Sequence, residues 1–251
     1  MQIQRLNMDN SWFLQLKGLR LLVDPWLEGV EIDFFRWFNM QWHKTQPLPF
    51  DQLPYFDAVL ITQKYPDHFH RATLKRLAPK RIIAPASIEH KLTKLFPDSE
   101  IIGLSKKSTS CTINDTQIQF FPTQRRIDPI YDAYLIRDDT EALFLAPHGY
   151  ASDTTYAWPD HPVKLLISPF NHYELPALLG GIVSPGIEGL VQLTKKIRPR
   201  FVVATHDEDK HARGLVSKLA KIRRTPLADL NAIEELAGLI VDIPDYQPVI
   251  L

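Results

Sequence analysis

The sequence predicts a layered α/β fold, in which β-sheets are covered by helices. Short apolar runs separated by turn residues predict strands along much of the chain, and Lys17-Gly18 marks a tight turn between two of them. Other runs alternate with segments whose apolar residues recur at helical spacing. A mixture of hairpins and strand–helix units is typical of helices stacked on sheets. No linker, charge block or repeat divides the 251 residues, so we expect a single domain over residues 1–251.

In the first half of the chain, apolar runs predict strands that are joined by turns or by helices. The predicted strands are 3–6, 12–16, 19–23, 57–61, 81–84, 100–104 and 116–121. Ser87 is expected to cap a helix that reaches Leu95, because Ile88 and Leu92 continue the helical spacing towards it.

The second half repeats this style. Its predicted strands are 131–136, 142–145, 163–168 and 201–204. Ser184-Pro185 is expected to open a helix between the last two, because proline lacks the N–H that the first helical position leaves unpaired. Ile187, Leu190 and Ile197 would lie on its apolar face.

Residues 27–54 interrupt this order, and the stretch 34–42 carries five aromatic residues in nine positions. Three interpretations remain open for these rings. They pack on the body of the protein, they form a wall or lid over a substrate cleft, or they offer a surface to a partner.

The composition excludes several classes of protein. Lys and Arg total 29 and so do Asp and Glu, whereas nucleic-acid binders usually show a basic excess, so we expect no nucleic-acid partner. The single Cys111 rules out an internal disulfide and a thiolate-rich metal site. The first ten residues lack the layout of a signal peptide, and no stretch approaches the ~20 apolar residues of a membrane helix. We therefore expect a cytoplasmic protein without a membrane partner; the sequence does not indicate its oligomeric state.

A polar loop that ends in Asp67-His68 follows the predicted strand 57–61. This layout resembles the metal loop of the metallo-β-lactamase superfamily, in which a strand is followed by the motif THxHxDH. Asp67 and His68 match that motif, whereas Gln63 and Tyr65 stand where its first two histidines would be.

Four further segments resemble this superfamily in the same order along the chain; they are 22–26, 118–124, 142–149 and 198–207. The first ends in a DPW sequence whose Asp24 would brace the metal loop. The second would carry the third histidine and has Gln124 there. The third has His148 where a bridging aspartate would be, and the fourth delivers the last histidine, His206. The resemblance implies a four-layer αβ/βα sandwich.

The resemblance also implies a site that is reduced to one metal ion. The positions that hold the first metal have all lost imidazole; they are Gln63, Tyr65 and Gln124. The positions that hold the second metal can all still coordinate an ion; they are Asp67, His68, His148 and His206. Three imidazoles and a carboxylate suit one divalent ion, for which we expect zinc, with iron, manganese or nickel as alternatives. A vestigial site without metal is the other reading.

The function implied by this site is metal-dependent hydrolysis of a small ester, lactone or phosphoester, since a bound metal activates water for attack. Tyr65 would then be a candidate proton donor, and Gln63 and Gln124 would hold water or the small-molecule substrate. The alternative is a catalytically inactive member of the superfamily that serves as a ligand-binding or interaction module.

Two other groups are candidates at the mouth of this site. Arg125 and Arg126 follow Gln124 directly and could clamp an anionic substrate, although paired loop arginines are also commonly just solvated. His172 follows the predicted strand 163–168 and is a candidate general acid, with a purely structural role as the alternative.

Overall fold

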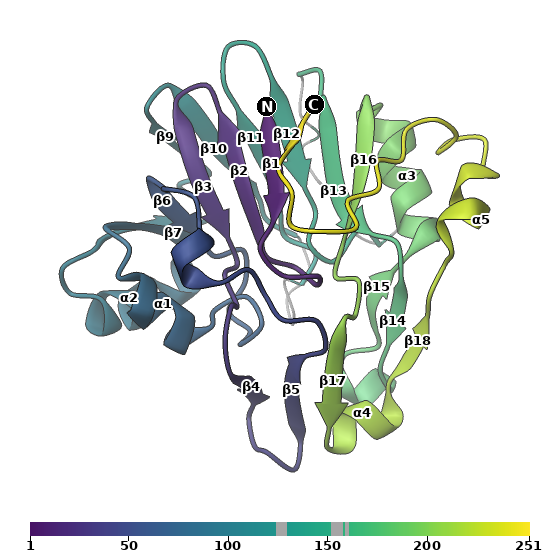
Figure 1. The fold of residues 1–251 in the computed structure, drawn as a ribbon, viewed down its shortest axis with the longest axis horizontal. Coiled ribbons are helices and arrows are strands. Elements are labelled where there is room, and N and C mark those ends of the chain that lie inside the picture. Colours follow the sequence, from purple (N-terminus) through teal and green to yellow (C-terminus); the bar gives the residue numbers. More distant parts are fainter. Residues whose placement is uncertain (124–129, 152–157, 159–160) are drawn as a thin grey trace.

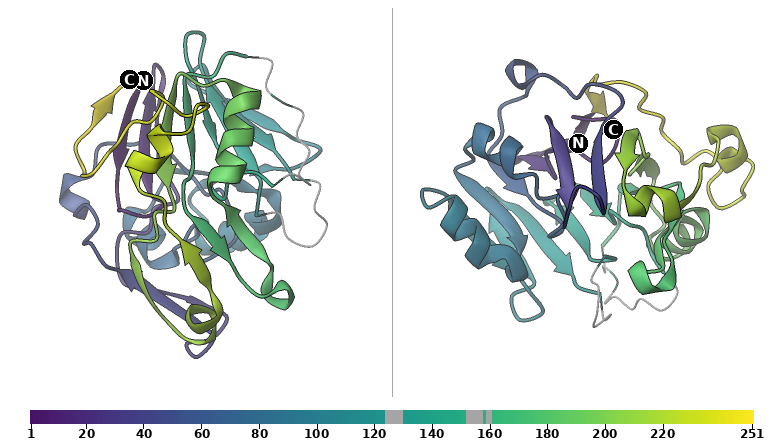
Figure 2. Two further views of the ribbon diagram at one scale, coloured as in Figure 1. Left: turned by 90° about the vertical axis from the view of Figure 1, so that its right-hand side faces the viewer. Right: turned by 90° about the horizontal axis from the view of Figure 1, so that it is seen from below.

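Two large sheets face each other at the centre of the computed structural model, which describes residues 1–123, 130–151, 158 and 161–251 (Figure 1). Helices lie outside both sheets, and smaller β-structures extend beyond one end of them. The two chain ends lie side by side, because residues 249–250 pair with residues 2–3 (Figure 2).

The first large sheet has seven strands in the order β19-β1-β2-β3-β6-β7-β8. Its strands, in this order, are Val249–Ile250, Gln2–Arg5, Trp12–Leu16, Leu19–Val23, Ala58–Leu60, Arg81–Pro85 and Glu100–Leu104. The first four are antiparallel neighbours, and the strands from β3 onward run parallel.

The second large sheet has six strands in the order β16-β13-β12-β11-β10-β9. Its strands, in this order, are Phe201–Thr205, Leu165–Pro169, Ala142–Leu145, Ala133–Arg137, Thr116–Phe121 and Ser110–Ile113. Strands β9 to β12 are antiparallel, whereas β12, β13 and β16 are parallel. In both sheets, parallel strands therefore end at one common edge.

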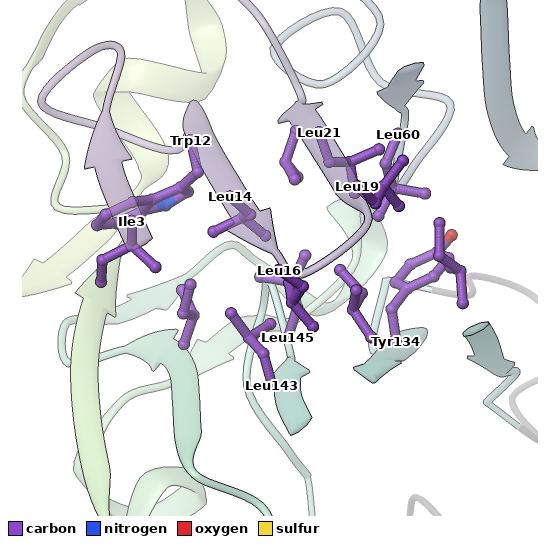
Figure 3. Packing of buried hydrophobic residues seen from close by; sticks show 14 of the residues in the cluster. Ile3, Trp12, Leu14, Leu16, Leu19, Leu21, Leu60, Tyr134, Leu143 and Leu145 are labelled. Atoms are coloured by element: carbon purple, nitrogen blue, oxygen red, sulfur yellow. The ribbon is translucent and has the colours of Figure 1, made fainter. Parts of the chain in front are cut away.

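The main hydrophobic core lies between the two sheets. Figure 3 shows Trp12, Leu14 and Leu21 of the first sheet facing Leu143 and Leu145 of the second. These side chains are at most 2% exposed. Burial of this apolar surface, at roughly 25 cal/mol per Å², is the main force that holds the sheets together.

Helices cover the outer face of each sheet. On the first sheet lie α1 (Arg71–Leu77), the 3₁₀ turn η2 (Ala86–Ile88) and α2 (Glu89–Leu95), whose Leu74 and Leu92 pack against its outward-facing residues. On the second lie α3 (Ile187–Ile197) and α5 (Leu227–Asn231), which pack through residues such as Leu190 and Leu230. The fold is thus a four-layer αβ/βα sandwich, and the predicted fold class is confirmed.

Two small sheets and three short helical segments complete the described structure. One sheet has the order β17-β5-β4 and the other the order β15-β14-β18. Their strands are β4 (Val30–Asp33), β5 (Asn39–His43), β14 (His172–Glu174), β15 (Ile182–Pro185), β17 (Lys210–Arg213) and β18 (Lys221–Arg223). The helical segments η1, η3 and α4 are Phe50–Gln52, Ala177–Leu179 and Leu215–Leu219.

Two predicted helix starts are wrong. Ser184 and Pro185 belong to strand β15, and α3 begins after Gly186, whose φ of 62° lets the chain turn out of the strand. Ser87 does not cap a helix: it lies inside the turn η2, and α2 begins after Ile88 without a side-chain cap. In each case another short element comes before the helix: strand β15 before α3, and the turn η2 before α2.

Among the described residues, no helix has both the length and the apolar character needed to cross a lipid bilayer.

Candidate metal centre

Three buried histidines converge at the edge where the parallel strands of both sheets end. His68 lies in the loop after β6, His148 in the turn after β12, and His206 directly after β16. One ring nitrogen of each lies within 4.8 Å of those of the other two. His68 Nε2 is 3.1 Å from His148 Nε2, and the buried Nε2 of His206 has no hydrogen-bond partner among the described residues.

Asp24 fixes the orientation of His68. Its carboxylate lies 2.7 Å from His68 Nδ1 and accepts hydrogen bonds from the backbone N–H and the hydroxyl of Thr62, at 2.7 and 2.5 Å. A carboxylate only accepts hydrogen bonds, so Nδ1 of His68 carries the proton. When the ring is neutral, it presents the lone pair of Nε2 to the other two histidines, the arrangement typical of a metal-binding histidine.

A tight turn places His148. The backbone N–H of Gly149 donates to the carbonyl of Ala146 at 2.9 Å, with Pro147 and His148 at the centre of the turn. Proline suits the second position of such a turn because its φ is already fixed, and Gly149 adopts a φ of 80°. The turn formed by Ala146–Gly149 therefore determines the position of the His148 ring.

His206 lies in the left-handed region of backbone space, with φ at 51°. Its backbone N–H donates to the carbonyl of Asp9 at 2.8 Å, which ties the end of β16 to the loop after β1. A non-glycine residue adopts this conformation at a cost of about 1–3 kcal/mol, and such strain is concentrated at functional sites. Here the strain turns the imidazole towards the other two rings.

Burial determines the protonation of the three rings. It lowers the pKa of His148 to about 3, with help from the charge of His68. Burial likewise lowers the pKa of His206 well below its ordinary value, reinforced by the other two rings. Burial alone would lower the pKa of His68 as well, but the carboxylates of Asp67 and Asp24 outweigh it and raise that pKa. Burial thus favours neutral rings at His148 and His206, and neutral imidazoles with free lone pairs are the form that binds metal; His68 would give up the proton on Nε2 when it binds an ion.

The three imidazoles fit a divalent cation. Two ligands at 2.0–2.2 Å from a tetrahedral zinc ion lie about 3.4 Å apart, which is close to the observed separation of His68 and His148. The unpartnered Nε2 of His206 offers a third donor. A buried polar atom without a partner costs roughly 1–3 kcal/mol, and a shared cation would remove that cost.

Asp67 lies beside this cluster, with its Oδ2 3.8 Å from His68 Nε2. Burial on its own would raise the pKa of Asp67, but electrostatic interactions with His68, Lys210 and His148 lower it, so the side chain is an anion. Among the described residues, Asp67 does not belong to a set whose ligand atoms all lie within 4.8 Å of one another. It can approach an ion only with a small side-chain shift.

A second group of potential ligands shares His206 and contains Asp9 and Glu208. The ammonium group of Lys210 already lies 3.1 Å from Asp9 Oδ2 and 3.8 Å from Glu208 Oε1. Burial opposes the charge of Lys210, but the surrounding carboxylates raise its pKa well above the ordinary value. Lys210 is therefore the cation of this second group.

Two of the three histidines open onto a cavity of about 1020 Å³. His148 and His206 line its inner end together with Asp67. The hairpin of β4 and β5 forms one wall, so the aromatic stretch 34–42 borders the same space as the histidines. Segment 173–184 lies on its other side. The interpretation of the aromatic stretch as a wall of a cleft is thus the one that the structure supports.

The other predicted site residues are more dispersed. Tyr65 lines the cavity, with the ammonium of Lys64 5.1 Å from its ring centre. The side-chain N–H of Gln63 instead donates to the carbonyl of Ile130, and Gln63 is not part of the cavity wall that the structure describes. His172 is also outside that wall and lies 3.6 Å from a carboxylate oxygen of Glu174.

Three predicted site residues, Gln124, Arg125 and Arg126, lie outside the described residues.

Sequence reasoning missed several ionisable residues around the histidines. Glu31, Glu208, Lys210 and Tyr173 line the cavity, and Asp9 contacts two of them. None of them belongs to a motif, although Glu208 and Lys210 follow His206 so closely that their proximity could have been anticipated.

The sequence and the fold both match known proteins. The sequence model of the family described as "Beta-lactamase superfamily domain" matches residues 7–206. No curated protein sequence matches the chain. An isothiocyanate hydrolase from Delia radicum gut bacteria superposes with a TM-score of 0.69 at 16% identity, covering 100% of this chain and 99% of that one.

Two further structures are similar over almost their whole lengths. A possible metal-dependent hydrolase from Veillonella parvula DSM 2008 has a TM-score of 0.70 at 14% identity, covering 100% of this chain and 99% of that one. The metallo-beta-lactamase fold protein YhfI from Bacillus subtilis has a TM-score of 0.60 at 14% identity, with 99% and 98% covered. At these identities the structures show a shared fold, and the sequence match shows descent: the chain belongs to the beta-lactamase superfamily.

Proposed function

We propose that this protein is a cytoplasmic hydrolase that uses one divalent metal ion to cleave a small ester, lactone or phosphoester. The observation that carries this proposal is the convergence of three buried imidazoles, one of which has a ring nitrogen without a partner among the described residues, and two of which line a large cavity. Two of the similar structures are described as hydrolases, one of them as possibly metal-dependent.

His68, His148 and His206 would hold the ion, and Asp67 would complete the set after a small shift. Zinc is the ion we expect, because imidazole nitrogen and carboxylate oxygen are both among its usual ligands; iron, manganese and nickel are the alternatives. When bound, the ion would act as a Lewis acid that polarises the substrate and activates water. Asp24 keeps the proton on Nδ1 of His68, and Tyr65 is placed on the cavity wall where it could donate a proton.

One ion, rather than two, agrees with the residues around the histidines. Gln63 gives its amide N–H to a backbone carbonyl instead of turning into the cavity. The second group of potential ligands already holds the ammonium of Lys210. Either feature disfavours another ion beside the first.

One observation favours the second candidate, an inactive ligand-binding module. His68 Nε2 and His148 Nε2 are close enough to share a hydrogen bond, which would satisfy both rings without a metal. This arrangement leaves the nitrogen of His206 unpartnered, so it explains less of the site than a metal ion does.

Elemental analysis of protein purified without chelators or a histidine tag distinguishes the two candidates. We expect about one equivalent of zinc, iron, manganese or nickel per chain, and a loss of most of it in His206→Ala. The matched control is His90→Ala, which removes an exposed histidine of α2 and should keep the metal. Less than about 0.1 equivalent in wild-type protein after metal supplementation would contradict a metal enzyme and leave the binding module.

A further inference from the structure

Glu31 is an ionisable residue of the cavity that the proposed reaction does not use. It lies on strand β4, is 3% exposed, and lines the cavity. Its Oε2 is buried and has no hydrogen-bond partner in the part of the chain that the structure describes. Leaving a buried carboxyl oxygen unpaired is costly, more so when the group is charged, so this position calls for a partner that comes from outside the chain.

The surroundings of Glu31 are negative. Asp33, Asp67 and Glu208 also line the cavity, and the described part of its wall offers only two lysines against these four acidic residues. One of the two, Lys210, is already paired with Asp9 and Glu208. A positive ligand charge would therefore enter a favourable potential.

The walls above Glu31 are apolar and aromatic. Phe34, Phe35 and Trp37 are 75%, 60% and 66% exposed, and the last two stack with their ring centres 5.9 Å apart. Leu178, 99% exposed, lies on the opposite wall. Aromatic faces attract cations and bury apolar groups, but they offer no oxygen ligands to an inorganic ion.

We propose that the cavity binds a ligand that carries a cationic nitrogen on an apolar body. The nitrogen pairs with Glu31, and the apolar body lies between the aromatic stretch and the segment that contains Leu178. An inorganic cation is a poorer occupant, because among the described residues Glu31 belongs to no group that could hold a metal. The identification of this ligand as the substrate rests on the proposed function. The binding of the ligand does not depend on that function.

The electrostatics of the free carboxyl agree with this occupant. Burial, together with the negative charges of Asp67 and Asp33, raises the pKa of Glu31 to about 9, although Lys210 opposes the shift. The negative potential that keeps a proton on Glu31 also attracts a cationic ligand, which would take the place of that proton.

Three near-isosteric probes test the proposal: 4-phenylbutylamine, 4-phenylbutan-1-ol and 4-phenylbutanoate. Calorimetric titration of wild-type protein, freed of metal with a chelator, should show the amine binding at least about tenfold more tightly than the alcohol, and the anion most weakly. This comparison needs no variant. An alcohol or anion that binds as tightly as the amine would overturn the proposal.

Substitution of Glu31 tests whether this residue causes the preference for the amine over the alcohol. Glu31→Gln should reduce the preference for the amine over the alcohol to within about threefold, because the amide keeps the shape and loses the charge. Asp139→Asn, which removes a 68% exposed carboxylate that pairs with Lys17, should leave it unchanged. A preference that survives in folded Glu31→Gln would overturn the assignment.

Metal-loaded protein separates this proposal from the proposed function. In this experiment (4-phenylbutyl)trimethylammonium is used in place of 4-phenylbutylamine, because a quaternary nitrogen cannot coordinate a metal. It should still bind more tightly than the alcohol, and a preference that disappears on metal loading would place the cation at the histidines and overturn the proposal. A protein that retains no metal but keeps the preference would contradict only the metal-dependent reaction.

Discussion

At the scale of single residues, the site depends on Asp24 as much as on the histidines it supports. Asp24 is 2% exposed, and its carboxylate joins Thr62 and His68. Asp24→Asn removes the charge that holds the proton on Nδ1 of His68. We expect metal affinity to fall by about 10–100-fold, the usual effect of losing such a partner, with the fold retained. Competition with a chelating dye measures this change.

Asp57→Asn is the matched control for this prediction. Asp57 is also a carboxylate of the first sheet and accepts two hydrogen bonds from the guanidinium of Arg20, at 3.1 Å each, but it is not part of the histidine cluster. Its variant should lose some stability and keep its metal affinity. Equal metal affinity in Asp24→Asn and wild-type protein would show that Thr62 and the loop alone position His68.

At the scale of elements, the sequence predicts the two large sheets well and the small ones poorly. Strands such as β6 and β12 are buried over their whole length, so their apolar runs are visible in the sequence. Strand β17 is largely exposed and has no apolar run that would predict it from the sequence. Its β-structure comes from pairing with β5, far away in the sequence, and local patterns do not carry that information.

The same distinction applies to the candidate site. The three histidines were predicted because each follows a buried strand within a motif, and the parallel strands bring them to one edge. Glu31 lines the cavity from a strand without a motif, and Asp9 contacts the cavity residue Lys210 from a loop without one, so only the tertiary structure reveals them.

The aromatic hairpin provides a test at this scale. Gly214 has a φ of 126°, and a Cβ there would lie 2.6 Å from the carbonyl oxygen of Phe38. Gly214→Ala should therefore displace the stretch that precedes β5 and cost at least about 2 kcal/mol, from backbone strain and collision together. Urea unfolding measures the cost, and chymotrypsin cleavage near Trp37 should become faster.

Gly238→Ala is the control for this prediction. Gly238 also has a positive φ, of 75°, but a Cβ there would meet nothing within 4 Å. Its variant should show only the conformational penalty of about 1–2 kcal/mol and an unchanged cleavage rate. Equal behaviour of the two variants would mean that the hairpin yields to the added methyl group without loss of packing.

At the scale of the whole molecule, the metal centre joins the two large sheets. His68 follows a strand of the first sheet, whereas His148 and His206 follow strands of the second. An ion held by all three would thus link both halves of the sandwich and bind only the folded state. At a free concentration 100 times the dissociation constant, such an ion adds about 2.7 kcal/mol to the free energy of unfolding.

For a chain of 251 residues this gain corresponds to a rise in melting temperature of about 5–10 °C. Calorimetry of chelator-treated protein, before and after addition of zinc, should show this rise in wild type and in His90→Ala. It should be absent in His206→Ala, which removes a ligand supplied by the second sheet. Since the stabilisation arises from linking both sheets, His68→Ala, which removes the ligand of the first sheet, should abolish it equally. A rise that persists in either ligand variant would place the ion elsewhere on the protein.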